Sequence, residues 1–332
     1  MKITFFSAKP YDKQFFDRSN ETHGFDIEYH ETHLGPHSLG LVDGADAICA
    51  FVNDKLNAEV IAGLHERGVK VVALRCAGFN NVDLDAAKQR GIMVCRVPAY
   101  SPEAVAEHTV AMILTTNRKT HKAYNRVREQ NFSLNGLLGY NLSGKTVGVI
   151  GTGKIGKAFI KIMQGFGCNI LAYDLYPDAA LAEKGVEYVP LETLLQNAHI
   201  ISLHCPLTPE NHYLINQQAL SLMKPGVTIV NTSRGGLINT KDIIHALKAK
   251  RVGALCIDVY EQEEKLFFRD LSSTIIEDDE IQRLMSFPNV LITAHQAFFT
   301  EEALTEIAQI TLGNIAQLAE NRMPPDSPFR LA

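Results

Sequence analysis

Residues 145–174, KTVGVIGTGKIGKAFIKIMQGFGCNILAYD, constrain the fold more than any other part of this 332-residue chain. An apolar run at 147–150 leads into three glycines spaced as GxGxxG. A helical pattern follows, and a second apolar run at 169–173 stops at an acid. This order predicts a strand, a tight turn, a helix and a second parallel strand. The glycines alone are a weak signal, because glycines recur in many turns, but the flanking pattern supplies the required context.

The helix of this stretch is predicted from apolar residues that recur on one face, and Gly167 is expected to end it. The residues of that face are Ile155, Phe159, Ile162, Met163 and Phe166. An ordinary strand–helix–strand turn with chance glycines is the alternative interpretation.

Each part of this stretch has a physical role in binding a dinucleotide. Gly151 permits a tight turn, Gly153 lets the backbone approach a pyrophosphate, and Gly156 lets the helix pack on the sheet. The helix N-terminus attracts the phosphate charge. Asp174 lies 18 residues after Gly156, where a carboxylate can accept hydrogen bonds from ribose hydroxyls. Because a carboxylate repels a 2′-phosphate, NAD(H) is favoured over NADP(H).

Short β-rich runs alternate with helical patterns along nearly the whole chain, which predicts α/β architecture. Several runs are continuously apolar, as expected for parallel strands covered on both faces. The predicted strands are 2–6, 47–51, 69–74, 93–97, 146–150, 170–173, 200–203, 228–231, 254–258 and 290–293.

The glycine turn lies near the middle of the chain, so the first hundred residues form a separate α/β unit in this interpretation. A helix expected from Ser101 to about Arg118 leads into the nucleotide domain. The helical pattern beyond Thr300 is expected to return to the N-terminal unit and make that unit discontinuous. The predicted domains are 1–100 with 299–332, which bind substrate, and 101–298, which binds NAD. The ligands are expected in a cleft between the two domains, beyond the carboxyl ends of the strands.

Charge and apolar patterning exclude several classes of protein. The formal net charge is −5 and no basic run occurs, which argues against a nucleic-acid or anionic-membrane surface. No apolar run approaches the roughly 20 residues that span a bilayer, and the run at 3–6 is too short for a signal peptide. Six scattered cysteines without metal-like spacing predict reduced thiols, a cytoplasmic protein and no metal site.

Three segments that follow predicted strands carry side chains suited to reducing a 2-oxo acid. They are 231–236 with Arg234, 258–263 with two glutamates, and 293–298 with His295. Arg offers a planar fork for a carboxylate and a carbonyl. Adding a hydride to the carbonyl leaves an alkoxide that needs a proton, which His can supply near neutral pH. A carboxylate beside the imidazole orients it.

With these residues identified, the sequence resembles the D-2-hydroxyacid dehydrogenase family over essentially its whole length. The shared elements are GTGKIG at 151–156, Asp174, HCPLT at 204–208, NTSRG at 231–235, DVYEQE at 258–263 and AH at 294–295. The branch of the family that acts on D-lactate also shares LRCAGFNNVD at 74–83, VPAYSPEAVAE at 97–107, HQAFF at 295–299 and a long segment at 261–288.

The resemblance implies roles for individual residues. His295 would be the acid/base, Glu263 its partner and Arg234 the cation that binds the substrate. Glu261 is the alternative partner of the histidine. The substrate would contact Ala77, Gly78, Tyr100, Arg234 and His295. The cofactor would contact Gly151, Gly153, Lys154, Ile155, Gly156, Asp174, His204, Cys205, Pro206, Thr232, Ser233 and Asp258, although Asp258 could instead lie behind the site and His204 and Tyr100 could instead be packing residues.

The implied reaction is the reversible reduction of pyruvate by NADH to D-lactate. A larger 2-oxo acid is the alternative substrate, although Tyr100, Phe298 and Phe299 suggest a crowded apolar pocket. A non-catalytic NAD-sensing protein, like the co-repressors that resemble this family, is the alternative of a different class. By resemblance, the chain is expected to form a homodimer or homotetramer, with the helix at 101–118 as a contact. The ten histidines other than His204 and His295 are expected to be surface or helix residues.

Overall fold

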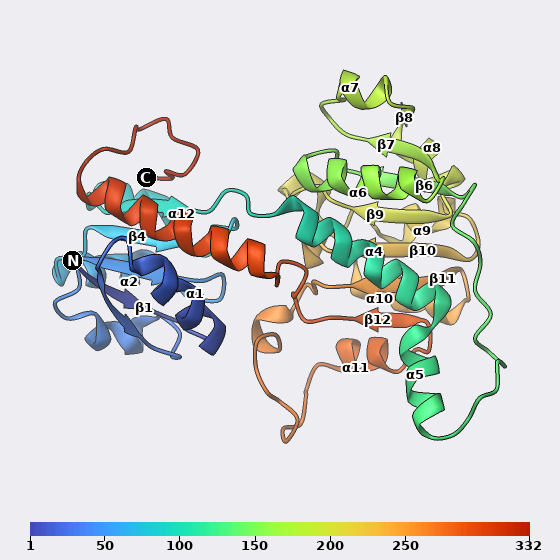
Figure 1. Ribbon diagram of the computed structural model, residues 1–332, viewed down its shortest axis with the longest axis horizontal. Coiled ribbons are helices and arrows are strands. Elements are labelled where there is room, and N and C mark those ends of the chain that lie inside the picture. Colours follow the sequence, from blue (N-terminus) through green and yellow to red (C-terminus); the bar gives the residue numbers. More distant parts are fainter. The chain divides into compact units, whose positions relative to one another are not determined.

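The computed structural model describes residues 1–332 and divides into two compact units (Figure 1). One unit is Met1–Ser101 with Phe298–Ala332, and the other is Pro102–Ala297. Each unit is built on one parallel sheet flanked by helices, which confirms the predicted fold class. The unit bounds differ by one residue at each junction from 1–100 with 299–332 and 101–298.

The first unit has a five-stranded sheet in the order β2-β1-β3-β4-β5. Its strands are β1 (Lys2–Phe5), β2 (Asp26–Tyr29), β3 (Ala47–Ala50), β4 (Val71–Leu74) and β5 (Met93–Arg96). On one side, α1 (Pro10–Asn20) packs against α12 (Glu301–Ala319), and α12 lies against β4 and β5. On the other side lie η1 (Pro36–Val42), α2 (Ala58–Glu66) and α3 (Leu84–Gln89), whose apolar residues form a single core with the sheet.

The second unit has a seven-stranded sheet in the order β12-β11-β10-β9-β6-β7-β8. Its strands are β6 (Thr146–Ile150), β7 (Asn169–Tyr173), β8 (Val186–Tyr188), β9 (Ile200–Leu203), β10 (Val227–Asn231), β11 (Val252–Ile257) and β12 (Val290–Ile292). All of them pair in parallel, so their carboxyl ends meet at one edge of the sheet. Ligands bind at this edge in open α/β sheets.

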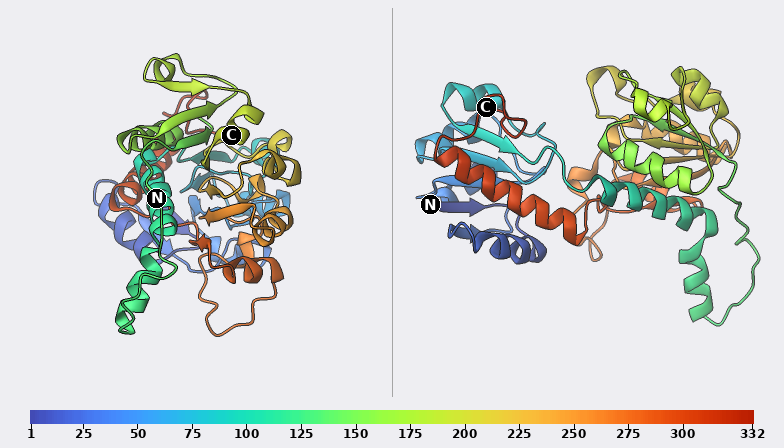
Figure 2. Two further views of the ribbon diagram at one scale, coloured as in Figure 1. Left: turned by 90° about the vertical axis from the view of Figure 1, so that its right-hand side faces the viewer. Right: turned by 45° about the horizontal axis from the view of Figure 1, so that its top comes forward.

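Two hydrophobic cores cover the two faces of this sheet. One core contains residues of α4 (Pro102–Arg118) and α6 (Lys154–Gly165). The other contains residues of α8 (Leu191–Asn197), α9 (Gln217–Leu222), α10 (Thr240–Lys248) and α11 (Asp279–Met285). Figure 2 shows α5 (Thr120–Arg128) and the loop after it, both green, projecting from this unit. The remaining elements are α7 (Ala179–Ala182) and the 3₁₀ turns η2 (Pro209–Asn211), η3 (Gly235–Leu237) and η4 (Glu263–Lys265).

The ten strands predicted from the sequence are all present, to within two residues at each end. The prediction missed β2 and β8, and both are outermost strands of their sheets. In β2 the exposed residues alternate with half-buried ones, whereas β3, β4, β9 and β10 are buried at every position. Neither β2 (DIEY) nor β8 (VEY) has the continuous apolar run on which the prediction relied.

The predicted apolar face of α6 was wrong at its C-terminal end. The helix buries Gly156, Phe159, Ile160 and Met163, whereas Phe166 is 39% exposed. Because α6 ends at Gly165, Phe166 is the C-cap residue and no longer continues the buried face. Gly167 adopts φ 73° and ends the helix, as predicted.

None of the helices combines the length and the apolar composition that crossing a bilayer requires.

Candidate functional site

In the second unit, the sequence-predicted residues follow strands whose carboxyl ends lie at one edge of the sheet. They are Gly151 after β6, Asp174 after β7, His204 after β9, Arg234 after β10, Asp258 and Glu263 after β11, and His295 after β12. The parallel topology therefore brings to one edge residues that are distant in the sequence.

The glycine turn after β6 is closely packed at two glycines and open at the third. Gly151 has φ 96°, and a Cβ there would lie 2.5 Å from the backbone nitrogen of Cys205. A Cβ on Gly156 would lie 2.1 Å from the carbonyl oxygen of Gly151. A Cβ on Gly153 would have no atom within 4 Å, and Gly153 is the N-cap of α6. The turn therefore offers an open helix N-terminus that suits a pyrophosphate.

Asp174 carries a fixed negative charge at the end of β7. Its Oδ2 accepts hydrogen bonds from the Thr152 backbone N–H at 2.6 Å and from the Thr152 hydroxyl at 3.0 Å, and its Oδ1 accepts one from the Tyr176 N–H at 2.9 Å. Partial burial alone would raise the pKa of Asp174, but these hydrogen bonds outweigh it and lower the pKa. The side chain is therefore an ionised acceptor, which fits the ribose hydroxyls of NAD and repels a 2′-phosphate.

The segment after β9, residues 204–206, packs against the glycine turn. His204 Nε2 lies 2.8 Å from Ser202 Oγ, and its ring centroid is 4.9 Å from that of Phe159. Burial lowers the pKa of His204 to about 3, so its ring is neutral. The hydroxyl of Ser233 donates to the Cys205 carbonyl at 2.7 Å. The side chain of His204 therefore packs against protein groups, and the segment can contact a cofactor through its backbone.

Two further residues of the expected cofactor set also bond to protein groups. The Pro206 carbonyl accepts a hydrogen bond from Asn211 Nδ2 at 2.7 Å. Thr232 is buried, with its hydroxyl 2.9 Å from that of Thr109 on α4.

His295 and Glu263 form a hydrogen-bonded pair. Nδ1 of His295 lies 2.8 Å from Oε1 of Glu263, and the two side chains are 21% and 20% exposed. Because a carboxylate can only accept, Nδ1 is the donor. The other oxygen, Oε2, accepts from the Tyr260 backbone N–H at 2.9 Å, which fixes the plane of the carboxylate. The partner of the histidine in the structure is thus Glu263, whereas Glu261 interacts with Tyr213 and raises the pKa of that phenol.

Asp258 organises the loop that carries His295. Its carboxylate is buried and accepts hydrogen bonds from the Thr293 hydroxyl at 2.5 Å and from the backbone N–H groups of Gln296 and Ala297 at 2.9 Å each. The His295 N–H donates to the Asp258 carbonyl at 2.7 Å. These bonds hold His295 at φ 53°, a left-handed conformation that is uncommon for a residue other than glycine. Asp258 thus contacts the loop of the histidine.

His108 was missed among the site residues. As the sequence predicted, this histidine lies in a helix, α4. Its Nε2, however, is 3.2 Å from the Thr293 hydroxyl and 3.5 Å from Asp258 Oδ1. Burial would raise the pKa of Asp258, yet the hydrogen bonds from His108, Thr293 and the loop backbone lower it. No local pattern could indicate this contact, since His108 and Asp258 are 150 positions apart.

Arg234 lies in a loop that packs directly on the neighbouring loop after β11. Its carbonyl accepts a hydrogen bond from Asn231 Nδ2 at 2.9 Å, and its Nη1 donates to the Ser233 carbonyl at 2.7 Å. A Cβ on Gly235 would lie 2.1 Å from the carbonyl carbon of Tyr260, so only glycine permits this approach. The close packing ties the position of Arg234 to the loop that carries Glu263.

In the first unit, Ala77 and Gly78 follow β4 and lie at the carboxyl edge of the five-stranded sheet. Tyr100 belongs to an aromatic cluster there. Its ring centroid is 6.1 Å from that of Phe298. The ring centroids of Phe298 and Phe299 are 6.2 Å apart, and those of Phe299 and Tyr11 are 4.8 Å apart. The sequence interpretation grouped three of these residues and did not include Tyr11.

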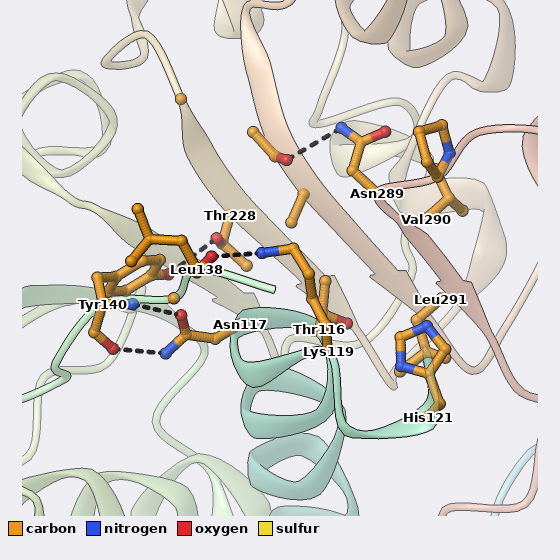
Figure 3. Close-up of a pocket in the computed structure, with 15 residues that line it drawn as sticks. Thr116, Asn117, Lys119, His121, Leu138, Tyr140, Thr228, Asn289, Val290 and Leu291 are labelled. Carbon is orange, nitrogen blue, oxygen red and sulfur yellow. Dashed lines mark hydrogen bonds between the residues drawn. The ribbon is translucent and has the colours of Figure 1, made fainter. Parts of the chain in front are cut away.

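A cavity of about 210 Å³ lies at the opposite edge of the seven-stranded sheet (Figure 3). It is lined by the amino ends of β10, β11 and β12 and by the end of α4. Several of its polar groups are paired with one another: Asn117 bonds to both backbone groups of Tyr140, and Asn289 donates to the Gly253 carbonyl at 3.0 Å. The bonds from Asn117 hold the segment around Tyr140 against the end of α4, and the cavity is separate from the candidate site.

Known proteins match this chain over nearly its whole length. Residues 110–297 match the family model for the D-isomer specific 2-hydroxyacid dehydrogenase, NAD binding domain. D-lactate dehydrogenase of Escherichia coli is 53% identical over 326 residues, which cover 98% of this chain and 99% of that protein.

Solved structures are similar over the same length. The apo-structure of the E. coli D-lactate dehydrogenase has a TM-score of 0.92 at 50% identity and covers all of both chains. The pyruvate reductase of Chlamydomonas reinhardtii has a TM-score of 0.93 at 43% identity, with 98% of both chains covered. The chain belongs to the D-isomer specific 2-hydroxyacid dehydrogenase family and carries its NAD-binding domain.

Proposed function

We propose that this chain is an NAD-dependent dehydrogenase that reduces pyruvate to D-lactate: pyruvate + NADH + H⁺ ⇌ D-lactate + NAD⁺. The observation that carries the proposal is the His295–Glu263 pair at 2.8 Å, at the sheet edge that also carries Arg234 and the glycine turn. The names of the similar E. coli and Chlamydomonas proteins support pyruvate and D-lactate as the reactants.

The glycine turn and Asp174 would hold the cofactor. The backbone at Gly153 and the start of α6, at Lys154 and Ile155, would face the pyrophosphate, and Asp174 would accept from the ribose hydroxyls. Ser233 and the backbone of residues 204–206 would border it. The bound cofactor supplies a hydride to the carbonyl carbon of the substrate.

His295 would supply the proton. The bond from Nδ1 to Glu263 fixes the tautomer and the orientation of the ring, so Nε2 is the atom that would exchange a proton with the substrate oxygen. When the ring is protonated, the carboxylate of Glu263 compensates its charge. Through its bonds to the loop, Asp258 would act as a positioning residue and not as a direct ligand of the cofactor.

Arg234 would bind the carboxylate and the carbonyl oxygen of the 2-oxo acid through its planar fork. By resemblance to the family, the backbone N–H groups of Ala77 and Gly78 would bind the same carboxylate, and Tyr100 would line the substrate pocket. Arg234 and the imidazolium would together stabilise the negative charge that develops on the oxygen.

The proposed reaction is tested by following NADH oxidation with pyruvate, 2-oxobutyrate, phenylpyruvate and hydroxypyruvate in parallel, with a stereospecific assay of the product. We expect the highest kcat/KM with pyruvate, and D-lactate as the product. A higher kcat/KM with a bulkier acid would leave the proposed mechanism unchanged but would replace pyruvate as the proposed substrate. NADH binding without turnover of any of the four acids would favour a sensor of NAD(H).

Replacing His295 by Gln should remove the proton donor while keeping a polar side chain. We expect kcat for pyruvate reduction to fall by about 10²–10⁴, as is typical of a lost general acid. Glu261→Gln is the matched control, because Glu261 interacts with Tyr213 and not with the histidine; its kcat should stay within about threefold of the original value. Activity of His295→Gln within a few-fold of the original would refute the assignment.

Replacing Asp174 by Ala should narrow the preference for NADH over NADPH. The carboxylate both binds the ribose hydroxyls and repels a 2′-phosphate, so its loss should raise KM for NADH and lower KM for NADPH. The ratio of kcat/KM for the two cofactors measures the effect, with Glu187→Ala on β8 as the control. A ratio that stays unchanged would remove the ribose role from Asp174.

We propose a homodimer or homotetramer in the cytoplasm. Free cysteines, five of them buried, suit a reducing compartment. On and after α5 the chain exposes several large apolar side chains, at 62% for Tyr124, 72% for Phe132, 81% for Leu134 and 88% for Leu138. Such exposure is typical of a contact surface, and a second copy of the chain would cover it.

Sedimentation velocity tests this contact. The purified chain should sediment as a dimer or tetramer at micromolar concentration, and Phe132→Ser with Leu134→Ser should shift it to smaller species. Lys157→Ser, on α6, serves as the control. A monomeric original protein would contradict the proposal.

A further inference from the structure

The loop that follows β4, residues 76–79, is held in its middle by an arginine from the neighbouring strand. Arg96 is the last residue of β5, and its Nη1 donates to the carbonyl oxygen of Ala77 at 3.0 Å. The guanidinium also lies 4.9 Å from the centroid of the Phe79 ring. One side chain therefore contacts the loop at two points, on both sides of Gly78.

The bond to Ala77 determines where the N–H of Gly78 points. The two residues share one trans peptide group, since the chain contains no cis peptide bonds. In a trans peptide the C=O and the N–H point in opposite directions. Because Arg96 holds the carbonyl oxygen, the N–H of Gly78 is directed to the side opposite the guanidinium.

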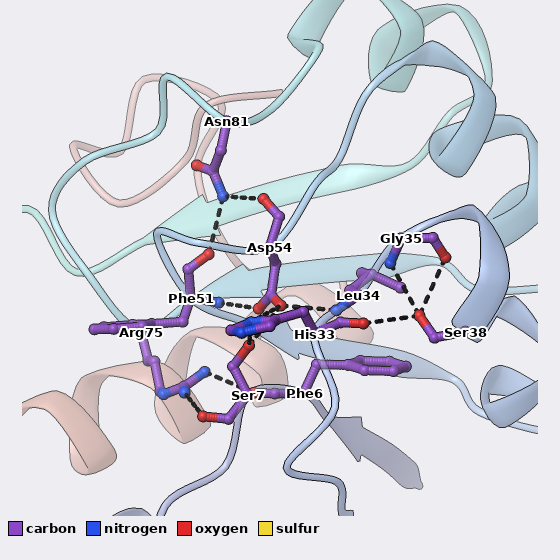
Figure 4. Close-up of polar contacts among 10 residues, drawn as sticks. All are labelled: Phe6, Ser7, His33, Leu34, Gly35, Ser38, Phe51, Asp54, Arg75 and Asn81. Atoms are coloured by element: carbon purple, nitrogen blue, oxygen red, sulfur yellow. Dashed lines mark hydrogen bonds and ion pairs between the residues drawn. The ribbon is translucent and has the colours of Figure 1, made fainter. Parts of the chain in front are cut away.

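The start of this loop is anchored by a second, buried arginine. Arg75 donates to the carbonyls of Phe6 at 3.0 Å and Ser7 at 2.8 Å (Figure 4). Its Nε also lies 3.3 Å from Asp12. The ring of Phe51 lies 4.6 Å from its guanidinium carbon. Arg75 therefore joins the loop after β4 to the segments that follow β1 and β3.

The segment beyond the loop is anchored by Asn81 and Asp54. Asn81 Nδ2 donates to the carbonyls of Phe51 and Asp54 at 2.9 Å each. Asp54 is buried and accepts from the Ser7 hydroxyl at 2.6 Å and from the Leu34 N–H at 2.8 Å. His33 Nδ1 lies 2.7 Å from the same hydroxyl. Since the serine hydroxyl donates to Asp54, these three residues are a structural cluster and not a nucleophile with its base.

We infer that Arg96 is a positioning residue that aims the Gly78 N–H at the carboxylate of the 2-oxo acid. The inference rests on the proposed function, in which the N–H groups of Ala77 and Gly78 bind that carboxylate. With both ends of the loop anchored by Arg75 and Asn81, the Ala77–Gly78 peptide is the part whose rotation Arg96 restrains. Because the N–H is already oriented, less free energy is spent on ordering the loop when the substrate binds. Arg96 therefore acts on substrate affinity and not on the proton transfer.

Arg96 has features that lysine does not reproduce. A planar guanidinium can donate along its edge to the carbonyl while its face lies over an aromatic ring. Lysine keeps the charge but has neither the fork nor the flat face. Arg96→Lys therefore separates orientation of the peptide from attraction by a positive charge.

The test compares Arg96→Met, Arg96→Lys and the control Arg90→Met in steady-state kinetics with pyruvate at saturating NADH. Arg90 lies at the end of α3 in the same unit, and its guanidinium reaches the Ala86 carbonyl at 3.5 Å. For Arg96→Met we expect KM for pyruvate to rise about 10-fold, the size of a weakened hydrogen bond to a charged group, with kcat within about threefold. Arg96→Lys should raise KM less, and Arg90→Met should leave both constants unchanged.

Two further readouts separate orientation from a general structural effect. The Kd for NADH, measured by fluorescence, should stay unchanged in Arg96→Met. The ratio of kcat/KM for pyruvate and 2-oxobutyrate should also stay unchanged, because both acids present the same carboxylate. If Arg96→Met fails to fold, as judged from its thermal transition, Phe79→Leu replaces it: this variant removes the stacked ring and should raise KM for pyruvate by a smaller factor.

The outcomes distinguish this inference from the function on which it rests. If the unmodified chain does not turn over a 2-oxo acid, the proposed function fails. If it does, an unchanged KM in Arg96→Met would overturn the positioning role. Full recovery by Arg96→Lys would show that charge alone matters, and a loss confined to kcat would place Arg96 in the chemical step; either result would also overturn it.

Discussion

The buried carboxylate of Asp258 is the interaction on which the geometry of the candidate site depends. An ionised group inside a protein is stable only when its oxygens are hydrogen-bonded. Here the bonds come from the Thr293 hydroxyl and from the backbone of Gln296 and Ala297. Satisfying Asp258 therefore forces the chain after β12 to bend around it, with His295 in a left-handed conformation.

The position of His295 in turn determines its contacts with the other candidate residues of the second unit, Glu263 and Arg234. The bend brings the imidazole of His295 to Glu263, whose other oxygen is fixed by the Tyr260 N–H. Close backbone contact at Gly235 then ties the loop of Arg234 to Tyr260. Hydrogen bonds and backbone contacts thus fix Glu263, His295 and Arg234, which lie in the loops after three strands. Such contacts hold a site rigid before a ligand binds.

The parts of this protein that were predictable are those whose signal is local. The strands buried on both faces, such as β3 and β9, show continuous apolar runs, and the glycine turn and Asp174 follow one another within a single strand–helix–strand segment. The outermost strands β2 and β8 were missed because they lack such runs. Phe166 was misplaced because periodicity gives the face of a helix but not the residue at which the helix ends.

Residue types and their order along the chain determined the α/β class and the dinucleotide turn and favoured NAD. The candidate set of Arg234, Glu263 and His295 also needed the resemblance to the family, because no periodicity singles these residues out. The tertiary structure decided which groups meet. It paired His295 with Glu263 and not with Glu261, placed Asp258 behind the loop of the histidine, and brought His108 and Arg96 to their partners. The reason is physical: parallel strands bring to one edge loops that are distant in the sequence, and the hydrogen bonds between those loops leave no periodic pattern in it.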